Sequence, residues 1–295
     1  MKPRIALDVH AHLAPAIPAG VRDVEVAMRQ LFDPAALRGW MDQRGVAQAW
    51  VSAPPPLYRP HLDESASRGW FVYVNEALAS FADGRLRPLF HLPLEHPALA
   101  LELARRFGDG AGFSVPAGGL NVACFSDTRL NPLWEHLDAR QSFVFVHPGS
   151  CCDGRLAPFY LENLLGNPYE TTLAIAHLVF SGLRARCPRI RFCFAHGGGA
   201  AAMLAGRWQR GFETARPGVE RSLPAPREVL CTLYVDSIVH DPAALAQAAG
   251  VFGAGRILFG SDWPFPMGLP DPHEQLAGVD AGLRDSIFAA GRILE

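Results

Sequence analysis

Short apolar runs recur along the whole chain, and longer stretches with helical periodicity separate them. Parallel strands that are buried on both faces read as near-continuous apolar runs, not as alternating apolar and polar residues. The pattern therefore predicts eight buried parallel strands. They cover residues 5–10, 47–53, 86–93, 110–115, 142–147, 189–196, 231–237 and 256–262.

Helix signals lie between these runs. Asp33, Asn131 and Asp241 each precede a proline, so a capping side chain stands ahead of proline at the first helical position. Gly45 fits the end of the helix that Asp33 begins. Two longer periodic stretches and two proline-rich loops complete the prediction; the helices cover residues 67–82 and 170–186, and the loops residues 14–19 and 53–60.

Eight strands that alternate with helices predict an α/β fold, a (β/α)8 TIM barrel of the metal-dependent hydrolase type. The chain has 295 residues, of which 49% are hydrophobic, and α/β barrels commonly reach this length undivided. We therefore expect one domain over residues 1–295. A doubly wound sheet is the alternative, but it would show a glycine-rich phosphate loop where this chain has His10-Ala11-His12.

Composition narrows the function classes. The formal net charge of −2 gives no support for nucleic-acid binding, and no apolar run approaches the length of a membrane span. The first predicted strand begins at residue 5, so we expect no signal peptide. The six cysteines show no paired metal-binding spacing, and a cytoplasmic protein with reduced thiols is the simplest interpretation. The adjacent Cys151 and Cys152 are interpreted as ordinary loop thiols.

Polar residues stand where several predicted strands end. His10 and His12 are two residues apart, so they share one face of the first strand. His147, His196 and Asp262 end the fifth, sixth and eighth strands. Chemistry in a barrel occurs at these strand ends, and three histidines with a carboxylate suit zinc or a similar ion. Each residue alone has a structural interpretation, as a buried loop histidine or a turn cap; the joint pattern favours a site.

This arrangement resembles the amidohydrolase superfamily. The resemblance is strongest to the branch that contains α-amino-β-carboxymuconate-ε-semialdehyde decarboxylase, and it runs over most of the chain. The stretches that carry it are Asp33-Pro34, Met41-Asp42-Gln43-Arg44-Gly45-Val46, Asp153-Gly154-Arg155, Glu170-Thr171-Thr172, Phe192-Cys193-Phe194-Ala195-His196-Gly197-Gly198-Gly199, Gly206-Arg207, Val239-His240-Asp241-Pro242 and Asp262-Trp263-Pro264-Phe265-Pro266.

The resemblance implies a role for each residue at the strand ends. His10, His12, His147 and Asp262 become the metal ligands. His196 becomes the catalytic acid or base beside a metal-activated water, and Asp262 counts as catalytic through the metal it holds.

Two arginines are implied as binders of a substrate carboxylate. Arg207 matches an arginine that the family inserts from the neighbouring subunit, so the resemblance implies a homodimer. Arg29 stands near the position of a second such arginine, with slightly different spacing to Asp33. A planar guanidinium suits bidentate pairing with a carboxylate, and we therefore expect a small carboxylate as substrate.

The metal count follows from the lysines. Some members of the superfamily hold two metals, bridged by a carboxylated lysine on the fourth strand. Here residues 110–115 contain no lysine, and Lys2 is the one lysine of the chain; Ser114 is a poor substitute. We predict one divalent metal ion. The nitrogen-rich ligand set favours Zn²⁺, with manganese, iron and cobalt as alternatives.

The predicted function is a metal-dependent decarboxylase of a small unsaturated or aromatic carboxylic acid. The main alternative is a metal-dependent hydrolase of a lactone or amide on the same fold. A hydratase and a non-catalytic metal- or acid-binding protein are further options. One departure concerns the substrate pocket: after His147-Pro148 the resembling decarboxylases carry Trp and Asp, whereas this chain has Gly149-Ser150. The change removes an aromatic wall beside the metal.

Overall fold

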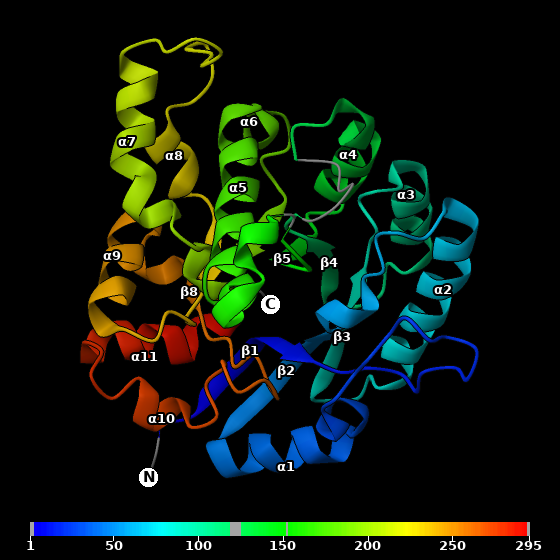
Figure 1. Ribbon diagram of the computed structural model, residues 1–295. Coiled ribbons are helices and arrows are strands. Elements are labelled where there is room, and N and C mark those ends of the chain that lie inside the picture. Colours follow the sequence, from blue (N-terminus) through cyan, green and yellow to red (C-terminus); the bar gives the residue numbers. More distant parts are fainter. Residues whose placement is uncertain (1–2, 119–124, 152, 294–295) are drawn as a thin grey trace.

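The computed structural model describes residues 3–118, 125–151 and 153–293. Eight parallel strands form one sheet in which neighbours follow chain order (Figure 1). Each of the eight predicted strands is present. The strands are β1 Ile5–His12, β2 Val46–Ser52, β3 Leu86–His91, β4 Gly112–Pro116, β5 Phe143–His147, β6 Arg191–Phe194, β7 Tyr234–Asp236 and β8 Ile257–Leu258.

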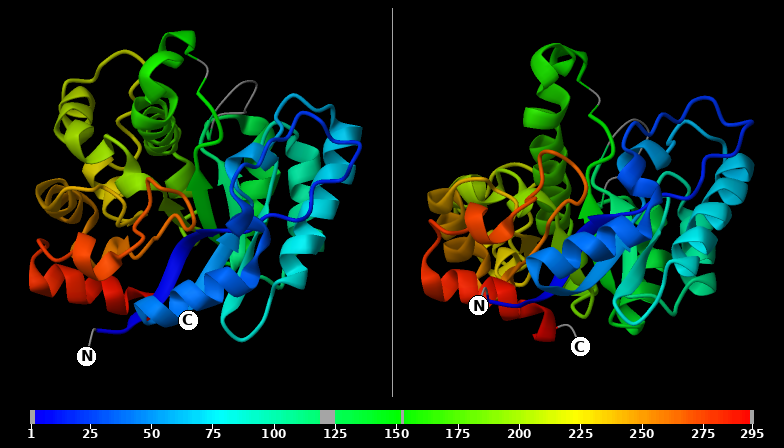
Figure 2. Two further views of the ribbon diagram at one scale, coloured as in Figure 1. Left: turned by 60° about the horizontal axis from the view of Figure 1, so that its bottom comes forward. Right: turned by 90° about the horizontal axis from the view of Figure 1, so that it is seen from below.

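The sheet curls round until its last strand meets its first. β8 is short, but the segment that follows it continues alongside β1, as the orange and blue segments of Figure 2 show. The amide of Val9 donates to the carbonyl of Phe259 over 3.0 Å, and the amide of Asp262 donates to the carbonyl of His10 over 2.7 Å. The result is a nearly closed barrel, which confirms the predicted fold class and places Asp262 beside β1.

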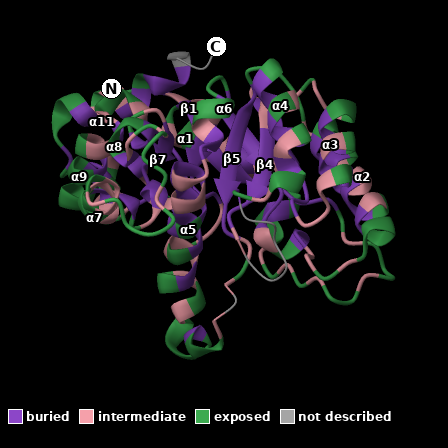
Figure 3. Cartoon of the chain, turned by 90° about the horizontal axis from the view of Figure 1, so that it is seen from above, coloured by how far each residue is buried: buried purple, intermediate pink, exposed green. Residues whose placement is uncertain are grey.

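Helices lie outside the strands, and the strands are buried between them (Figure 3). Among the described residues, no helix combines the length and apolar content that crossing a bilayer requires. The helices are α1 Pro34–Arg44, α2 Glu64–Ser80, α3 Pro97–Arg106, α4 Asn131–Ala139, α5 Asn167–Phe180, α6 Leu183–Arg186, α7 Ala201–Glu213, α8 Pro226–Leu230, α9 Pro242–Phe252, α10 Pro272–Gln275 and α11 Ala281–Ala289.

Two of the three predicted N-caps are confirmed. The carboxylate of Asp33 accepts hydrogen bonds from two amides of the first turn of α1, and that of Asp241 accepts one at the start of α9. The prediction for Asn131 is wrong, because α4 already includes this residue. A short 3-10 turn runs directly into the helix, so the preceding Leu130 has helical backbone angles instead of the extended ones that a cap needs.

The helix predicted over residues 170–186 is two helices. α5 begins earlier, at Asn167, and ends at Phe180; α6 follows from Leu183. Gly182 between them has φ of 72°, in the left-handed region. A right-handed helix cannot continue through that conformation, and glycine adopts it at little steric cost.

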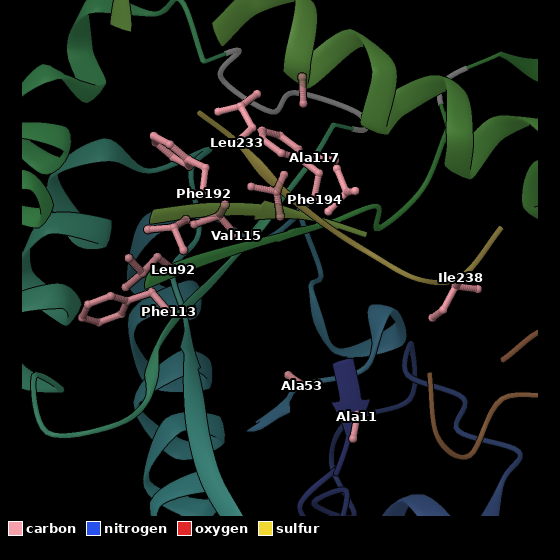
Figure 4. Close-up of a cluster of buried hydrophobic side chains, with 14 of the residues drawn as sticks. Ala11, Ala53, Leu92, Phe113, Val115, Ala117, Phe192, Phe194, Leu233 and Ile238 are labelled. Carbon is pink, nitrogen blue, oxygen red and sulfur yellow. The ribbon is translucent and has the colours of Figure 1, made fainter. Parts of the chain in front are cut away.

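The core has two parts, one outside the strands against the helices and one inside the barrel. On β5, Val144 and Val146 face outward to the helices, whereas Phe143 and Phe145 fill the barrel. Figure 4 shows part of the outer cluster, including side chains of β4 and β6. Because the side-chain period of a strand is two, His147 follows Phe145 on the inner face and stands above the packed barrel interior.

An irregularity in β1 sets the direction of its two histidines. Val9 packs inside the barrel, whereas Ala11 packs in the outer cluster, although the two are separated by one residue. The pairing register between β1 and β2 shifts in this stretch. Such a shift moves the following side chains to the other face of a strand. His10 and His12 consequently point toward the barrel axis, where His10 lies against Phe145 with ring centroids 4.8 Å apart.

Candidate metal centre

The barrel brings four predicted ligands together at its carboxyl-terminal end. One ligand atom from each of His10, His12, His147 and Asp262 lies within 4.8 Å of all the others, and all four residues are buried. Nε2 of His10 lies 3.1 Å from Nε2 of His12. Oδ1 of Asp262 lies 3.2 Å from each of these two nitrogens. We call these four residues the metal group.

Each histidine of the metal group uses its Nδ1 atom for a contact with the protein. Nδ1 of His10 donates to Oδ2 of Asp236 over 2.7 Å, and Nδ1 of His12 lies 3.1 Å from Oγ of Ser52. Nδ1 of His147 donates to the carbonyl of the next residue over 2.8 Å. Partners of this kind orient metal-binding imidazoles and select their tautomer. All three Nε2 atoms are therefore available to one ion.

Nε2 of His147 is buried and lacks a hydrogen-bond partner among the described residues. Oδ1 of Asp262 is also buried, and it lies against the Nε2 atoms of His10 and His12 within the metal group. Burying such atoms without a partner is costly. Lone pairs that converge on one point instead fit a cation, and three nitrogens with one oxygen suit a first-row divalent metal. The residues present thus fit a metal ion.

The charges of the metal group also favour a cation. Burial opposes ionisation of Asp262, but His10 and His12 hold the pKa of its carboxyl well below the ordinary value. Burial lowers the pKa of His12 and of His147, which keeps both rings neutral at pH 7. Burial also acts on His10, yet Asp262 and Asp236 together raise its pKa to about 10. A metal ligand must be unprotonated, so an ion bound here would replace the proton of His10.

Asp236 is a functional residue that the sequence pattern does not single out. This carboxylate ends β7, is fully buried, and accepts hydrogen bonds from the amides of Gly197 and Ile238 in addition to His10. It therefore links a ligand on β1 to the loop that carries His196. The available signal was a lone carboxylate in the apolar run 231–237.

His196 lies beside the metal group without belonging to it. Its ring centroid is 5.2 Å from that of His147 and 5.5 Å from that of His10. Nδ1 of His196 is buried and has no hydrogen-bond partner among the described residues. Burial lowers the pKa of this imidazole, so the ring is neutral at pH 7. This arrangement leaves His196 able to exchange a proton with a molecule bound next to the metal group.

A cavity of about 510 Å³ opens above the metal group. His147, His196 and Asp262 form its floor, and most of the remaining lining is apolar. Among the described residues, no arginine or lysine lines this cavity. The other lining residues are Pro55, Pro56, Gly149, Tyr160, Asn163, Leu164, Asn167, Pro168, Gly197, Gly199, Ala202, Met203, Ile238, Val239, His240, Ala244, Gln247, Ala248, Phe265, Pro266 and Met267.

The structure does not bring the two predicted arginines to the cavity. Arg207 is exposed on α7, and Arg29 is exposed in a short turn ahead of α1. Neither lines the cavity. Ser114 lies on β4, the strand that carries no lysine in this chain. Its Oγ lies 3.4 Å from Nδ1 of His91.

The structure also shows what fills the space beside Gly149. A Cβ atom at this position would lie only 2.6 Å from Cδ2 of Tyr58. The ring of Tyr58 is buried and lies over His91, with centroids 4.3 Å apart. An aromatic wall is therefore present next to Gly149, but the loop after β2 supplies it.

The chain is similar in sequence to a known decarboxylase. A 2-amino-3-carboxymuconate-6-semialdehyde decarboxylase of Dictyostelium discoideum is 37% identical over 215 residues, which cover 70% of this chain and 60% of that relative. The chain thus spans less than two thirds of the relative's length.

Solved structures show the same fold. A 5-carboxyvanillate decarboxylase of Sphingomonas paucimobilis superimposes with a TM-score of 0.84 at 19% identity, over 99% of this chain and 98% of that one. A dihydroxybenzoic acid decarboxylase of Polaromonas, with bound manganese, gives 0.79 at 18% identity, over 99% and 97%. A sequence profile of the family described as amidohydrolase matches residues 7–289. The chain belongs to this amidohydrolase family.

Proposed function

We propose that this protein is a metal-dependent decarboxylase, a carbon–carbon lyase that acts on a small unsaturated or aromatic carboxylic acid. The observation that carries the proposal is His196, which lies beside the metal group at the floor of the cavity. The decarboxylase names of the Dictyostelium relative and of the two solved structures support the same reaction class. We propose further that residues 1–295 form one barrel domain.

The proposed cofactor is one divalent ion held by His10, His12, His147 and Asp262. Zn²⁺ is the first choice because three of the four ligand atoms are imidazole nitrogens. Mn²⁺ is the alternative, since manganese is bound in the Polaromonas structure. A bound ion would supply Lewis-acid stabilisation of negative charge that develops on the substrate.

The residues of the chain provide the remaining chemistry. Decarboxylation breaks the bond between carbon and the carboxylate, releases carbon dioxide and leaves an electron pair on the carbon, which takes up a proton. His196 can hold such a proton on its imidazole ring and return it, because this residue lines the cavity beside the metal group. Apart from its floor, most of the lining of the cavity is apolar.

We propose that the protein forms a homodimer in which Arg207 binds the substrate carboxylate in the partner's cavity. Large apolar side chains are exposed on the part of α5, and the turns before it, that projects from the barrel (Figure 3). Exposed apolar patches of this kind mark interaction sites. Tyr160 and Leu164 belong both to this patch and to the cavity lining, and Met203 on α7 is a further exposed apolar residue of the lining. A second copy bound here would border the cavity.

We propose two further assignments. Arg29 is proposed as a second binder of the carboxylate, by movement of its turn or through the partner. A cytoplasmic location is proposed from the cysteines: Cys187, Cys193 and Cys231 form no disulfide, while Cys124 and Cys152 lie outside the described residues.

The test is carbon dioxide release from a panel of unsaturated and aromatic acids, by protein loaded with Zn²⁺ or Mn²⁺ and by chelator-treated protein. We expect release with metal and none without it. A His196→Ala variant should retain its metal and lose about 100-fold or more in turnover. His177→Ala, on α5 and outside the cavity lining, is the matched control.

Each alternative gives a distinct result. Lactone or amide cleavage without carbon dioxide would establish the hydrolase, and water addition to a double bond would establish the hydratase. Tight acid binding without turnover under full metal loading would indicate a binding protein. Full activity in metal-free protein would contradict every metal-dependent reading.

A further inference from the structure

The segments after three consecutive strands each contain a non-glycine residue with a positive φ angle. His196 follows β6, His240 follows β7 and Asp262 follows β8, with φ values of 54°, 57° and 54°. A positive φ is unfavourable for residues with a side chain, and it persists where the surroundings impose it, often at functional sites. All three side chains line the same cavity. Two of them already have roles in the proposed reaction; His240 has none.

The segment around His240 is held on both sides. Ahead of it, the amide of Ile238 donates to Asp236 over 3.1 Å, the same carboxylate that orients His10. After it, Asp241 caps α9 by accepting from the amide of Ala244 over 2.8 Å. The backbone conformation of His240 is therefore determined by its neighbours, while its own ring has no hydrogen bond among the described residues.

Few polar side chains line the cavity apart from those at its floor, and the exposed His240 is one of them. The charged and metal-binding groups of the cavity are gathered at the floor, and no arginine or lysine lines it among the described residues. Away from the floor, the polar side chains of the lining include His240, Gln247, Asn163 and Asn167. An acid whose carboxylate lies at the floor would have these groups as polar neighbours in the rest of the cavity.

We propose that His240 is a substrate-binding residue that donates a hydrogen bond to an oxygen substituent, a hydroxyl or a second carboxylate, on the side of the acid away from the metal group. An imidazole carries at least one N–H group in either protonation state, so the donor is always present. The inference rests on the proposed function in one respect: it assumes that the acid's first carboxylate lies at the metal group.

The experiment compares two probes on full-length protein loaded with Zn²⁺. Benzoate carries one carboxylate; isophthalate carries a second, one ring position removed. Calorimetric titration should show that His240→Ala weakens isophthalate binding about tenfold, the effect of losing one good hydrogen bond, and leaves benzoate binding unchanged. His240→Gln retains a donor and should recover part of the loss. His240→Gly suits the positive φ, so it should fold normally and bind like His240→Ala.

Several results would overturn the inference. One is that His240→Ala weakens the binding of benzoate and of isophthalate equally. Another is that isophthalate binding is unchanged in both His240→Ala and His240→Gly. A third is that the wild-type protein binds isophthalate no more tightly than benzoate. The two proposals fail separately. If no acid releases carbon dioxide but the isophthalate preference depends on His240, decarboxylation is wrong and the binding role stands. If carbon dioxide is released and His240 has no effect, the binding role is wrong.

Discussion

At the scale of single residues, the second contact of each histidine matters as much as its place in the metal group. His10 presents Nε2 to the centre because Asp236 holds its Nδ1 at 2.7 Å. The same carboxylate accepts the amide of Gly197, next to His196. Asp236 therefore aligns both a metal ligand, His10, and the proposed acid or base, His196, although it is not itself a member of the metal group.

We predict that Asp236→Asn weakens metal binding by about 10–100-fold, because an amide no longer fixes the charge and tautomer of His10. Competition with a chromophoric chelator measures the affinity directly. Asp285→Asn, an exposed change on α11, is the control. Unchanged zinc affinity in a folded Asp236→Asn protein would show that His10 needs no such partner.

At the scale of elements, a contact between a helix and a loop fixes the place where β6 begins. Asp138 on α4 accepts from the amide of Arg189 over 2.6 Å and from its Nε over 2.9 Å. The pair anchors the segment that enters β6, the strand that leads to His196. Asp138 is partly desolvated, but the amide and the guanidinium hold the pKa of its carboxyl below the ordinary value.

This depressed pKa predicts the pH dependence of stability. A carboxyl whose pKa is lower in the folded state contributes stability above its unfolded pKa, about 4, and that contribution is lost as the pH falls through the folded pKa. Asp138→Asn should lower the free energy of unfolding by about 1 kcal/mol at pH 7. The difference should shrink below about pH 4.

Urea unfolding of both proteins at neutral and acidic pH measures the effect. Asp109→Asn, an exposed change, should show no pH-dependent difference from the wild type. A penalty for Asp138→Asn that stays constant with pH would rule out the ionised carboxylate as its source.

At the scale of the whole molecule, closure of the barrel creates the metal group. The segment after β8 pairs with β1, so residues about 250 positions apart in the chain form one metal group. The cavity above it has no arginine or lysine among its described lining residues, and exposed apolar side chains border it. A second copy is the proposed source of the missing charge.

This proposal predicts complementation between two inactive variants. Arg207→Ala and His196→Ala should each have little activity, because each leaves every site of its own homodimer incomplete. After the two are mixed and reassembled, half of the dimers are mixed, and each mixed dimer has one complete site. Activity should therefore recover to about a quarter of the wild-type value. Arg207→Ala reassembled with itself is the control. A monomeric protein in sedimentation, or a mixture without gain, would contradict the shared site.

The sequence by itself determined the eight strands, the barrel and the polar residues at the strand ends, which are His10, His12, His147, His196 and Asp262. These depend on local apolar patterns and on one general rule, that parallel strands of a barrel end at the same face. The division of these residues into four metal ligands and one acid or base was implied by the family resemblance. Tertiary structure decided the rest. The register shift in β1 turns His10 and His12 inward, Asp236 meets His10 across the barrel, and Tyr58 fills the space beside Gly149. None of these contacts has a local signature, because each joins residues whose distance is set only when the sheet closes.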